Sequence, residues 1–155
     1  MERLAGIFNR DFQEFFEALN RSRVQYLLVG GYAVIIYGYQ RSTGDLDIWV
    51  KPTKENYFCM MRAFQSFGLP TNTITLEQFL NIEAYDVFTF GVSPVAIDIM
   101  TRVKGIDFSE CYEKATQFVV DGIPIPVLDY QDLLDAKRAS GRFKDLADIE
   151  YLEEE

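Results

Sequence analysis

The spacing of hydrophobic and polar residues along the first fifty positions predicts a helix, a strand, a second helix and a second strand. Large hydrophobic side chains recur every three or four residues between Asn9 and Arg21, which is the spacing of an amphipathic helix. Residues 25–29 form a short apolar run that predicts a strand, and a glycine pair separates it from a short helix over 31–37. Residues 45–50 then alternate in the period of a second strand.

The rest of the chain continues with patterns of the same kinds. It predicts helices over 55–67, 76–82 and 108–114, and antiparallel hairpins over 85–100 and 117–127. A long helix is expected from residue 130 towards 152, with Gly141 as a break or kink. Because hairpins alternate with one strand–helix–strand unit, the expected fold class is α/β (α+β), a small, mixed, twisted sheet with helices mainly on one face.

Composition narrows the class of protein. The chain has 155 residues, of which 48% are hydrophobic, and this size suits one well-buried domain. No apolar run approaches the length of a membrane span, and the first residues are charged and interrupted, so we expect a cytoplasmic protein without membrane association. Cys59 and Cys111 form no CxxC motif and are expected to be buried as small hydrophobic residues.

The titratable residues exclude further classes of function. The chain has no histidine, which removes mechanisms of the serine-histidine-aspartate and cysteine-histidine types and the common histidine-bearing zinc sites. Carboxylates therefore remain as the candidate acids, bases and metal ligands. The net charge of −9 argues against a protein that holds long nucleic acid by neutralising phosphates, so small molecules or proteins fit better as partners.

Three aspartates in strand patterns form the candidate chemistry. Asp45 and Asp47 are two positions apart in a predicted strand, so their side chains project from one face, roughly 7 Å apart. Two such carboxylates repel each other unless a cation lies between them, and a hard divalent cation is the usual one. Asp98 is a single carboxylate in an otherwise apolar strand, where it needs a partner. That partner is either a basic residue in a salt bridge or a metal ion shared with the other two aspartates.

Two other features are suited to a phosphate ligand. The Gly30-Gly31 pair between a strand and a helix would bring backbone N–H groups at a helix N-terminus close to β- and γ-phosphates. Four of the fifteen basic residues lie between Lys137 and Lys144 in the predicted C-terminal helix. Ion pairs with neighbouring aspartates are the plainer interpretation of this cluster. Beside three aspartates, however, a basic helix face is what a polyphosphate would require.

The segment GGYAVIIYGYQRSTGDLDIWV, with the lone Asp98 on a later strand, resembles the nucleotidyltransferase superfamily of the DNA polymerase β type. The signature of that superfamily is a glycine turn, a short helix and an Asp-x-Asp strand. Together with Lys137, Arg142, Lys144 and Asp145, the segment is similar to small bacterial nucleotidyltransferase-like proteins related to AbiEii-type toxins and to lincosamide and aminoglycoside nucleotidyltransferases. The likeness covers about Val24 to Met100, and the C-terminal helix more loosely.

The resemblance implies a single nucleotidyltransferase-like domain over residues 1–155, with the helix over 129–152 packing near the active site. Asp45, Asp47 and Asp98 would be the catalytic residues and would hold Mg²⁺, with two ions expected. The nucleotide-binding residues would be Gly30, Gly31, Arg41, Thr43, Lys137, Arg142 and Lys144.

The function expected from these features is Mg²⁺-dependent transfer of a nucleoside monophosphate from a nucleoside triphosphate to a hydroxyl of a small molecule or a protein. A toxin–antitoxin or defence system is one setting that the resemblance suggests. The alternative is a catalytically inactive binding module, antitoxin-like or regulatory, that keeps the fold. A dinucleotide-binding unit fits poorly because the glycine pair lacks the GxGxxG pattern. The sequence leaves open whether the chain binds a partner protein or forms a homodimer.

Overall fold

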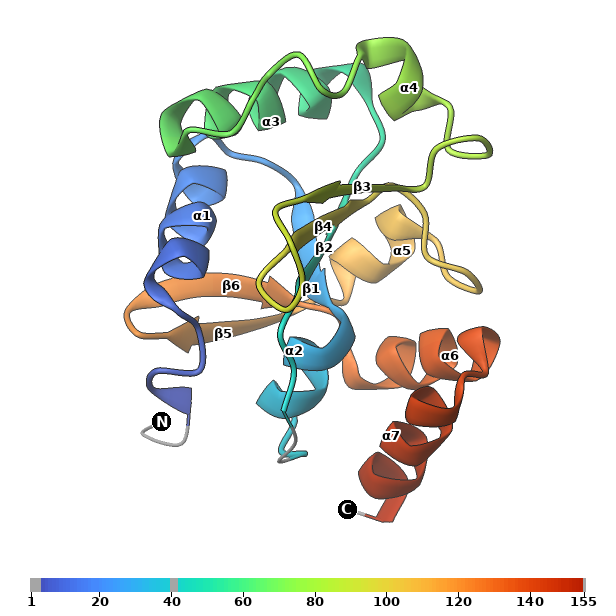
Figure 1. Ribbon diagram of the computed structural model, residues 1–155. Helices are drawn as coiled ribbons and strands as arrows, with labels where there is room; N and C mark the ends of the chain where they lie inside the picture. Colours follow the sequence, from blue (N-terminus) through green and yellow to red (C-terminus); the bar gives the residue numbers. More distant parts are fainter. Residues whose placement is uncertain (1–3, 40–41, 155) are drawn as a thin grey trace.

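The architecture is a six-stranded mixed sheet with seven helices, seen in a computed structural model that describes residues 4–39 and 42–154 (Figure 1). The strand order is β3-β4-β2-β1-β6-β5. The strands are β1 (Tyr26–Val29), β2 (Leu46–Val50), β3 (Val87–Phe90), β4 (Ile97–Met100), β5 (Thr116–Val120) and β6 (Ile123–Val127). The helices are α1 (Arg10–Arg21), α2 (Gly30–Ile36), α3 (Lys54–Phe67), α4 (Leu76–Leu80), α5 (Phe108–Glu113), α6 (Tyr130–Ser140) and α7 (Phe143–Glu154).

Strand pairing confirms the mixed sheet predicted from the sequence. The β1–β2, β3–β4 and β5–β6 pairs are antiparallel, whereas β1–β6 and β2–β4 are parallel. The parallel pairing of β2 with β4 sets Asp47 directly beside Asp98. Two strands that lie fifty residues apart in the chain thus bring the predicted carboxylates to one place on the sheet.

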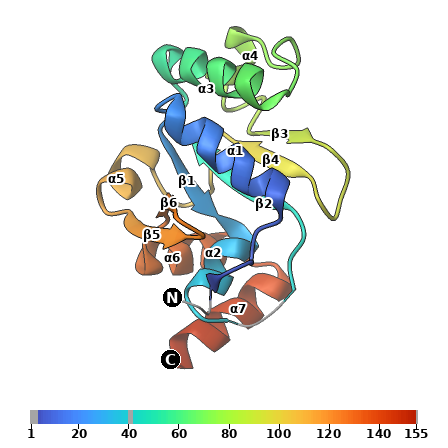
Figure 2. The same cartoon turned by 90° about the vertical axis from the view of Figure 1, so that its left-hand side faces the viewer.

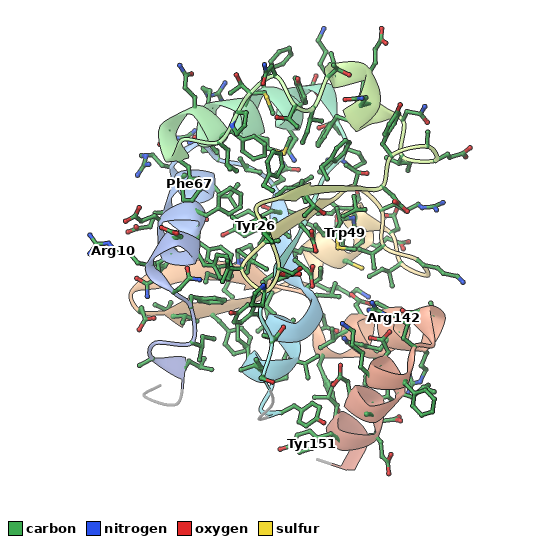
Figure 3. The ribbon with its side chains drawn as sticks, in the orientation of Figure 1. Arg10, Tyr26, Trp49, Phe67, Arg142 and Tyr151 are labelled. Atoms are coloured by element: carbon green, nitrogen blue, oxygen red, sulfur yellow. The ribbon has the colours of Figure 1, made fainter. Side chains whose placement is uncertain are left out.

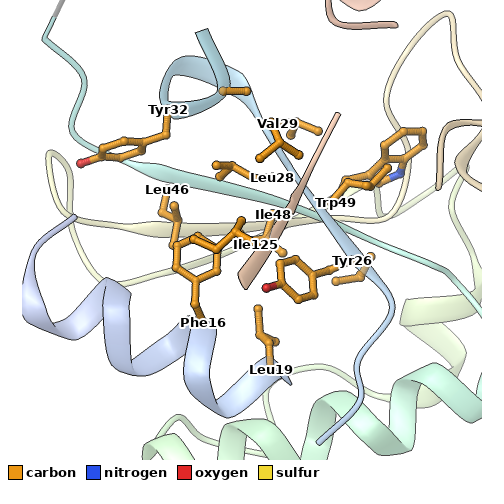
Figure 4. Packing of buried hydrophobic residues seen from close by; sticks show 14 of the residues in the cluster. Phe16, Leu19, Tyr26, Leu28, Val29, Tyr32, Leu46, Ile48, Trp49 and Ile125 are labelled. Atoms are coloured by element: carbon orange, nitrogen blue, oxygen red, sulfur yellow. The ribbon is translucent and has the colours of Figure 1, made fainter. Parts of the chain in front are cut away.

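The core lies mainly between the sheet and α1 with α3. Phe16 and Leu19 of α1 point at the sheet face that carries Leu46 and Ile48 (Figure 4). Because side chains alternate along a strand, Trp49 points to the opposite face, where its ring meets Phe108 of α5 edge to face. Figure 2 shows α1 lying across the first strands of the sheet.

Side-chain caps account for where two of the helices begin. Asn9 accepts a hydrogen bond from the Phe12 N–H, and Thr53 accepts one from the Asn56 N–H, so each caps its helix. The predicted long C-terminal helix is divided at the predicted break. Gly141 has φ +66°, a left-handed conformation that ends α6, and α7 begins at Phe143.

The two C-terminal helices lie together at the end of the molecule away from α3 and α4 in both views (Figures 1 and 2). Tyr151 of α7 stacks on Tyr39, with ring centroids 4.2 Å apart, and its hydroxyl donates to the Gly38 carbonyl. Helix α7 therefore holds the segment that follows α2. No described helix is long and apolar enough to cross a membrane.

Candidate active site

A cleft of about 930 Å³ brings together residues from distant parts of the chain. Its lining includes the β1–α2 turn, the segment before β2, the first halves of β2 and β4, and the junction of α6 and α7. Of the residues predicted to form the site, those in the described ranges all line this cleft: Gly30, Gly31, Thr43, Asp45, Asp47, Asp98, Lys137, Arg142 and Lys144. Arg41 lies outside the described residues.

Asp47 and Asp98 form the centre of the cleft. They are register partners on β2 and β4, and their carboxyl groups are hydrogen-bonded to each other. Burial, repulsion from Asp98 and the hydrogen bond with it raise the pKa of Asp47 to about 7, although Lys144 acts in the opposite direction. At neutral pH, Asp47 is therefore protonated in about half of the molecules.

Asp45 lies beside this pair but is held differently. Its Oδ2 accepts a 2.7 Å hydrogen bond from the Ser93 hydroxyl, and its Oδ1 accepts one from the Ala96 N–H. These bonds tie the start of β2 to the β3–β4 connection. Gly44 fits the same contact closely, because a Cβ there would lie 2.2 Å from the Pro94 carbonyl oxygen. Asp98 has its own support, since the Thr89 hydroxyl donates to its Oδ1 at 2.7 Å.

The glycine turn is fitted to the carboxylate. Gly30 has φ +72°, and a Cβ at this position would lie 2.1 Å from Asp47 Oδ2. Both the backbone conformation and the space therefore require glycine. Gly31 is buried at the start of α2. Both glycines line the cleft, so the turn lies next to Asp47 at the start of α2.

The basic residues at the α6–α7 junction divide into two kinds. Lys137 is only 5% exposed, and its ammonium lies 3.1 Å from both Asp145 and Asp148, which are buried as well. Arg142 binds the same Asp145 through Nε at 2.7 Å and Nη2 at 3.3 Å, yet its side chain is largely exposed (Figure 3). The ion pairs considered from the sequence are thus present, and they hold the basic residues at the cleft in fixed positions.

Lys137 therefore has a different setting from the one expected of a phosphate ligand. Its charge is neutralised by two buried carboxylates, which engage two of the three N–H donors of its ammonium inside the protein. Lys144 lines the cleft and acts electrostatically on Asp47, and no carboxylate of the described residues lies within salt-bridge distance of its ammonium. Arg142 and Lys144 are the cations that this wall offers to a ligand.

Replacing Lys137 with methionine is expected to lower the free energy of unfolding by about 3–5 kcal/mol, because Asp145 and Asp148 would remain buried without their cation. Urea denaturation measures this change. Arg138→Met is the matched control, since Arg138 is the next residue and makes only partly exposed ion pairs, so its loss should cost about 1 kcal/mol or less. Equal costs for the two variants would contradict the buried network.

Acid should weaken the same network. Burial works to raise the pKa of Asp145, but hydrogen bonds from Arg142, Ser140 and Lys137 outweigh it and lower the pKa to about 2. A carboxyl with a lowered pKa in the folded state stabilises the protein above about pH 4. That contribution is lost as the pH falls from about 4 towards 2.

Several residues of the cleft could not be predicted from sequence patterns. Ser93 and Thr89 bind the candidate catalytic aspartates, but they carry no signal beyond their place in a hairpin. Asp86, Arg102 and Lys104 line one end of the cleft and lie in segments that were given no chemical role. Their position depends on how β3 and the residues after β4 lie against the cleft, which local patterns do not specify.

The donor chemistry of the cleft fits Mg²⁺. Among residues 4–39 and 42–154, no group of three histidine, cysteine, aspartate or glutamate side chains is arranged so that it could hold a metal ion. Mg²⁺ is commonly held by one or two carboxylates with substrate phosphates and water rather than by an all-protein cage. Asp47 and Asp98, which are register partners on adjacent strands, supply such a pair, and burial together with repulsion from Asp98 raises the pKa of Asp47.

The chain has a nucleotidyltransferase-type fold, as expected from the sequence. Two solved structures similar to it carry this description. One is a candidate nucleotidyltransferase from Thermotoga maritima, TM1012, with a TM-score of 0.57 and 15% sequence identity over 94% of this chain and 92% of that one. The other is the lincosamide antibiotic adenylyltransferase LnuA with lincomycin bound, with a TM-score of 0.56 and 15% identity over 95% and 97% of the two chains.

Two comparisons at the level of sequence found no match. No protein-family model matches the chain, and no curated protein matches it. With 15% identity, the two structures establish the arrangement of helices and strands and leave the reaction to be argued from the residues of the cleft.

Proposed function

We propose that the protein is a Mg²⁺-dependent nucleotidyltransferase that moves a nucleoside monophosphate from a nucleoside triphosphate to a hydroxyl of a small molecule or a protein. The main support for this proposal is that the Asp47–Asp98 pair and the Gly30 turn line the same cleft. Carboxylates that lack a cation, next to backbone N–H groups at a helix start, suit a metal–phosphate ligand. A toxin–antitoxin or defence system is the setting suggested by the sequence resemblance.

The chain itself would bind the triphosphate from two sides. The N–H groups around Gly30 and Gly31 would donate to phosphate oxygens, with Thr43 nearby on the segment before β2. From the other wall, Arg142 and Lys144 would contribute positive charge. Asp145 orients the Arg142 guanidinium by accepting from Nε and Nη2, and Nη1 would donate to phosphate.

Asp47 and Asp98 would hold Mg²⁺ as a pair, together with phosphate oxygens and water. Asp45 as a third ligand, and two ions in all, are expected from the sequence. When bound, Mg²⁺ would neutralise phosphate charge and polarise the phosphorus under attack. With the cation present, Asp47 would be ionised, whereas it is partly protonated at neutral pH in the free protein. Asp45 would stay oriented by the Ala96 N–H.

The reaction follows from these positions. Asp98, oriented by Thr89, would accept the proton of the acceptor hydroxyl as its oxygen attacks the α-phosphorus. The bond from the acceptor oxygen to the α-phosphorus forms, and the bond from that phosphorus to the bridging oxygen breaks. Pyrophosphate leaves with the electron pair, and the acceptor keeps the nucleoside monophosphate as a phosphodiester.

Transfer is tested by incubating the protein with α-labelled nucleoside triphosphates, Mg²⁺ and cell extract, and following label that becomes attached to an acceptor. Lys144→Ala should raise the KM for the nucleotide by about tenfold or more and lower turnover at saturating nucleotide much less, because it removes charge from the triphosphate. Lys54→Ala, an exposed substitution in α3 outside the cleft, is the control. A protein that binds Mg²⁺ with nucleotide but labels nothing would favour the inactive binding module.

A further inference from the structure

One end of the cleft has no part in the nucleotide binding described above. It consists of residues from β3 and its approach and from the end of β4 with the segment after it: Asp86, Val87, Met100, Arg102, Val103 and Lys104. We call this set the distal end. The whole cleft has a volume of about 930 Å³, near the upper limit of the range for ligand pockets.

The distal end is continuous with Asp98. Met100 lies two residues further along β4, so its side chain is on the same face of the sheet, roughly 7 Å from that of Asp98. Pairing of β3 with β4 sets Val87 beside Met100, and the Thr101 N–H donates to the Asp86 carbonyl. A molecule resting on Val87 and Met100 would therefore have its near end at the proposed general base.

The charges at the distal end are unbalanced towards the positive. Arg102 lies 3.6 Å from Asp86, but both side chains are about half exposed, and such a pair is weak. Lys104 has no carboxylate within salt-bridge distance among the described residues. The six residues of the distal end thus include two cations and one carboxylate, in a chain whose net charge is −9.

A nucleobase would not explain this composition. A base has no charge to pair with two cations, and an apolar surface with a hydrogen-bonding edge would be enough to hold it. The floor of Val87, Met100 and Val103 suits an apolar body, whereas Arg102 and Lys104 suit an anionic group on that body.

We propose that the distal end is the acceptor subsite and that it selects a small hydroxylated acceptor with an apolar body and a carboxylate or phosphate group. This proposal rests on the proposed transfer function and specifies its substrate class. The acceptor hydroxyl lies at Asp98, the body lies on Val87 and Met100, and the anionic group lies against Lys104 and Arg102.

Matched probes test the charge preference directly. The compounds 4-hydroxyphenylacetate, 4-hydroxybenzylphosphonate, 4-hydroxyphenylethanol and 4-hydroxyphenylethylamine share a ring and a hydroxyl and differ mainly in the charge of the second group. Binding is measured by calorimetry or ligand-observed NMR, with the protein saturated with Mg²⁺ and a non-hydrolysable triphosphate. We expect the two anions to bind about five- to tenfold more tightly than the amine, with the neutral alcohol between. The two anions together separate a preference for carboxylate from one for phosphate.

Charge reversal supplies the second measurement. Lys104→Glu should remove the preference for the anions, whereas Lys54→Glu, an equal change of charge on α3, should leave it intact. The proposal is overturned by equal affinity for the anion and the amine, by a preference that survives Lys104→Glu, or by no binding of either anion at about 10 mM, a concentration at which weak fragments bind.

The outcome is separable from that of the proposed function. Binding of the anionic probes without any transfer of label to an acceptor would support an anion-selective site at the distal end and refute the transferase. Transfer of label to a cationic acceptor, or to bulk RNA with steep salt dependence, would keep the transferase and refute the subsite. Unchanged probe binding with a raised KM for nucleotide in Lys104→Glu would assign this end to the nucleotide and refute the subsite.

Discussion

Asp47→Asn should abolish Mg²⁺-dependent nucleotide binding and lower transfer activity by at least about 10³-fold, because it removes a charge from the pair proposed to hold the metal. The measurement is the thermal unfolding midpoint with and without Mg²⁺ and nucleotide, together with the label-transfer assay. Asp135→Asn, an exposed change on α6 outside the cleft, should keep the ligand-induced shift of the midpoint. If neither Mg²⁺ nor nucleotide changes the unfolding midpoint of the wild type, the protein does not bind nucleotide.

The same variant should be more stable than the wild type when metal is absent and the pH is high. The folded-state pKa of Asp47, about 7, lies above its ordinary value of 3.8. Its contribution to stability is therefore fully present below about pH 4 and is lost as the pH rises through 7. Each pKa unit corresponds to about 1.4 kcal/mol, and after allowance for partial exposure we expect Asp47→Asn to gain roughly 2 kcal/mol at pH 8 and little at pH 4.

Urea titrations at the two pH values, in chelator, make that comparison. The difference between variant and wild type should grow with pH. If the stability difference between Asp47→Asn and the wild type is the same at pH 4 and at pH 8, the two carboxylates do not destabilise the metal-free fold.

Gly30→Ala should disrupt the site and the fold together. The new Cβ would lie 2.1 Å from Asp47 Oδ2, and the φ of +72° is itself unfavourable for alanine. We expect a loss of roughly 3 kcal/mol in the free energy of unfolding, and loss of nucleotide binding because the carboxylate must move.

Gly6→Ala separates the two causes. Gly6 has almost the same φ, +74°, but a Cβ there meets nothing within 4 Å. It should therefore show only the backbone cost, about 1 kcal/mol, and bind nucleotide normally. If both alanine variants lost equal stability and both bound nucleotide, the close fit of Gly30 to Asp47 would have no functional meaning.

Much of the fold could be predicted because local patterns agree with the tertiary structure. The amphipathic spacing of α1, the alternation in β2 and the hairpins each have a local cause, and each element occurs where the pattern places it, within a few residues at its ends. The break at Gly141 also has a local cause, since glycine readily adopts the left-handed conformation that ends a helix.

The site was predictable as far as residue type and strand spacing could indicate it. The pairing of Asp47 with Asp98 depends on the parallel register of β2 and β4, which no local pattern specifies, although both aspartates could be singled out as unusual in apolar strands. For Lys137 the helix spacing suggested a phosphate-facing charge. The structure buries it between Asp145 and Asp148, and this requires the turn at Gly141 that brings α7 back against α6. Distance along one helix could not predict that return.

The order of the cleft walls along the chain has a consequence for synthesis. The glycine turn and the Asp47 strand are translated before Asp98, and Arg142, Lys144 and Asp145 follow after both. During synthesis, the Asp47–Asp98 pair can therefore form before the basic residues that are proposed to bind a triphosphate have been translated. A chain interrupted before α7 would therefore have the carboxylate pair without Lys144 and Asp145.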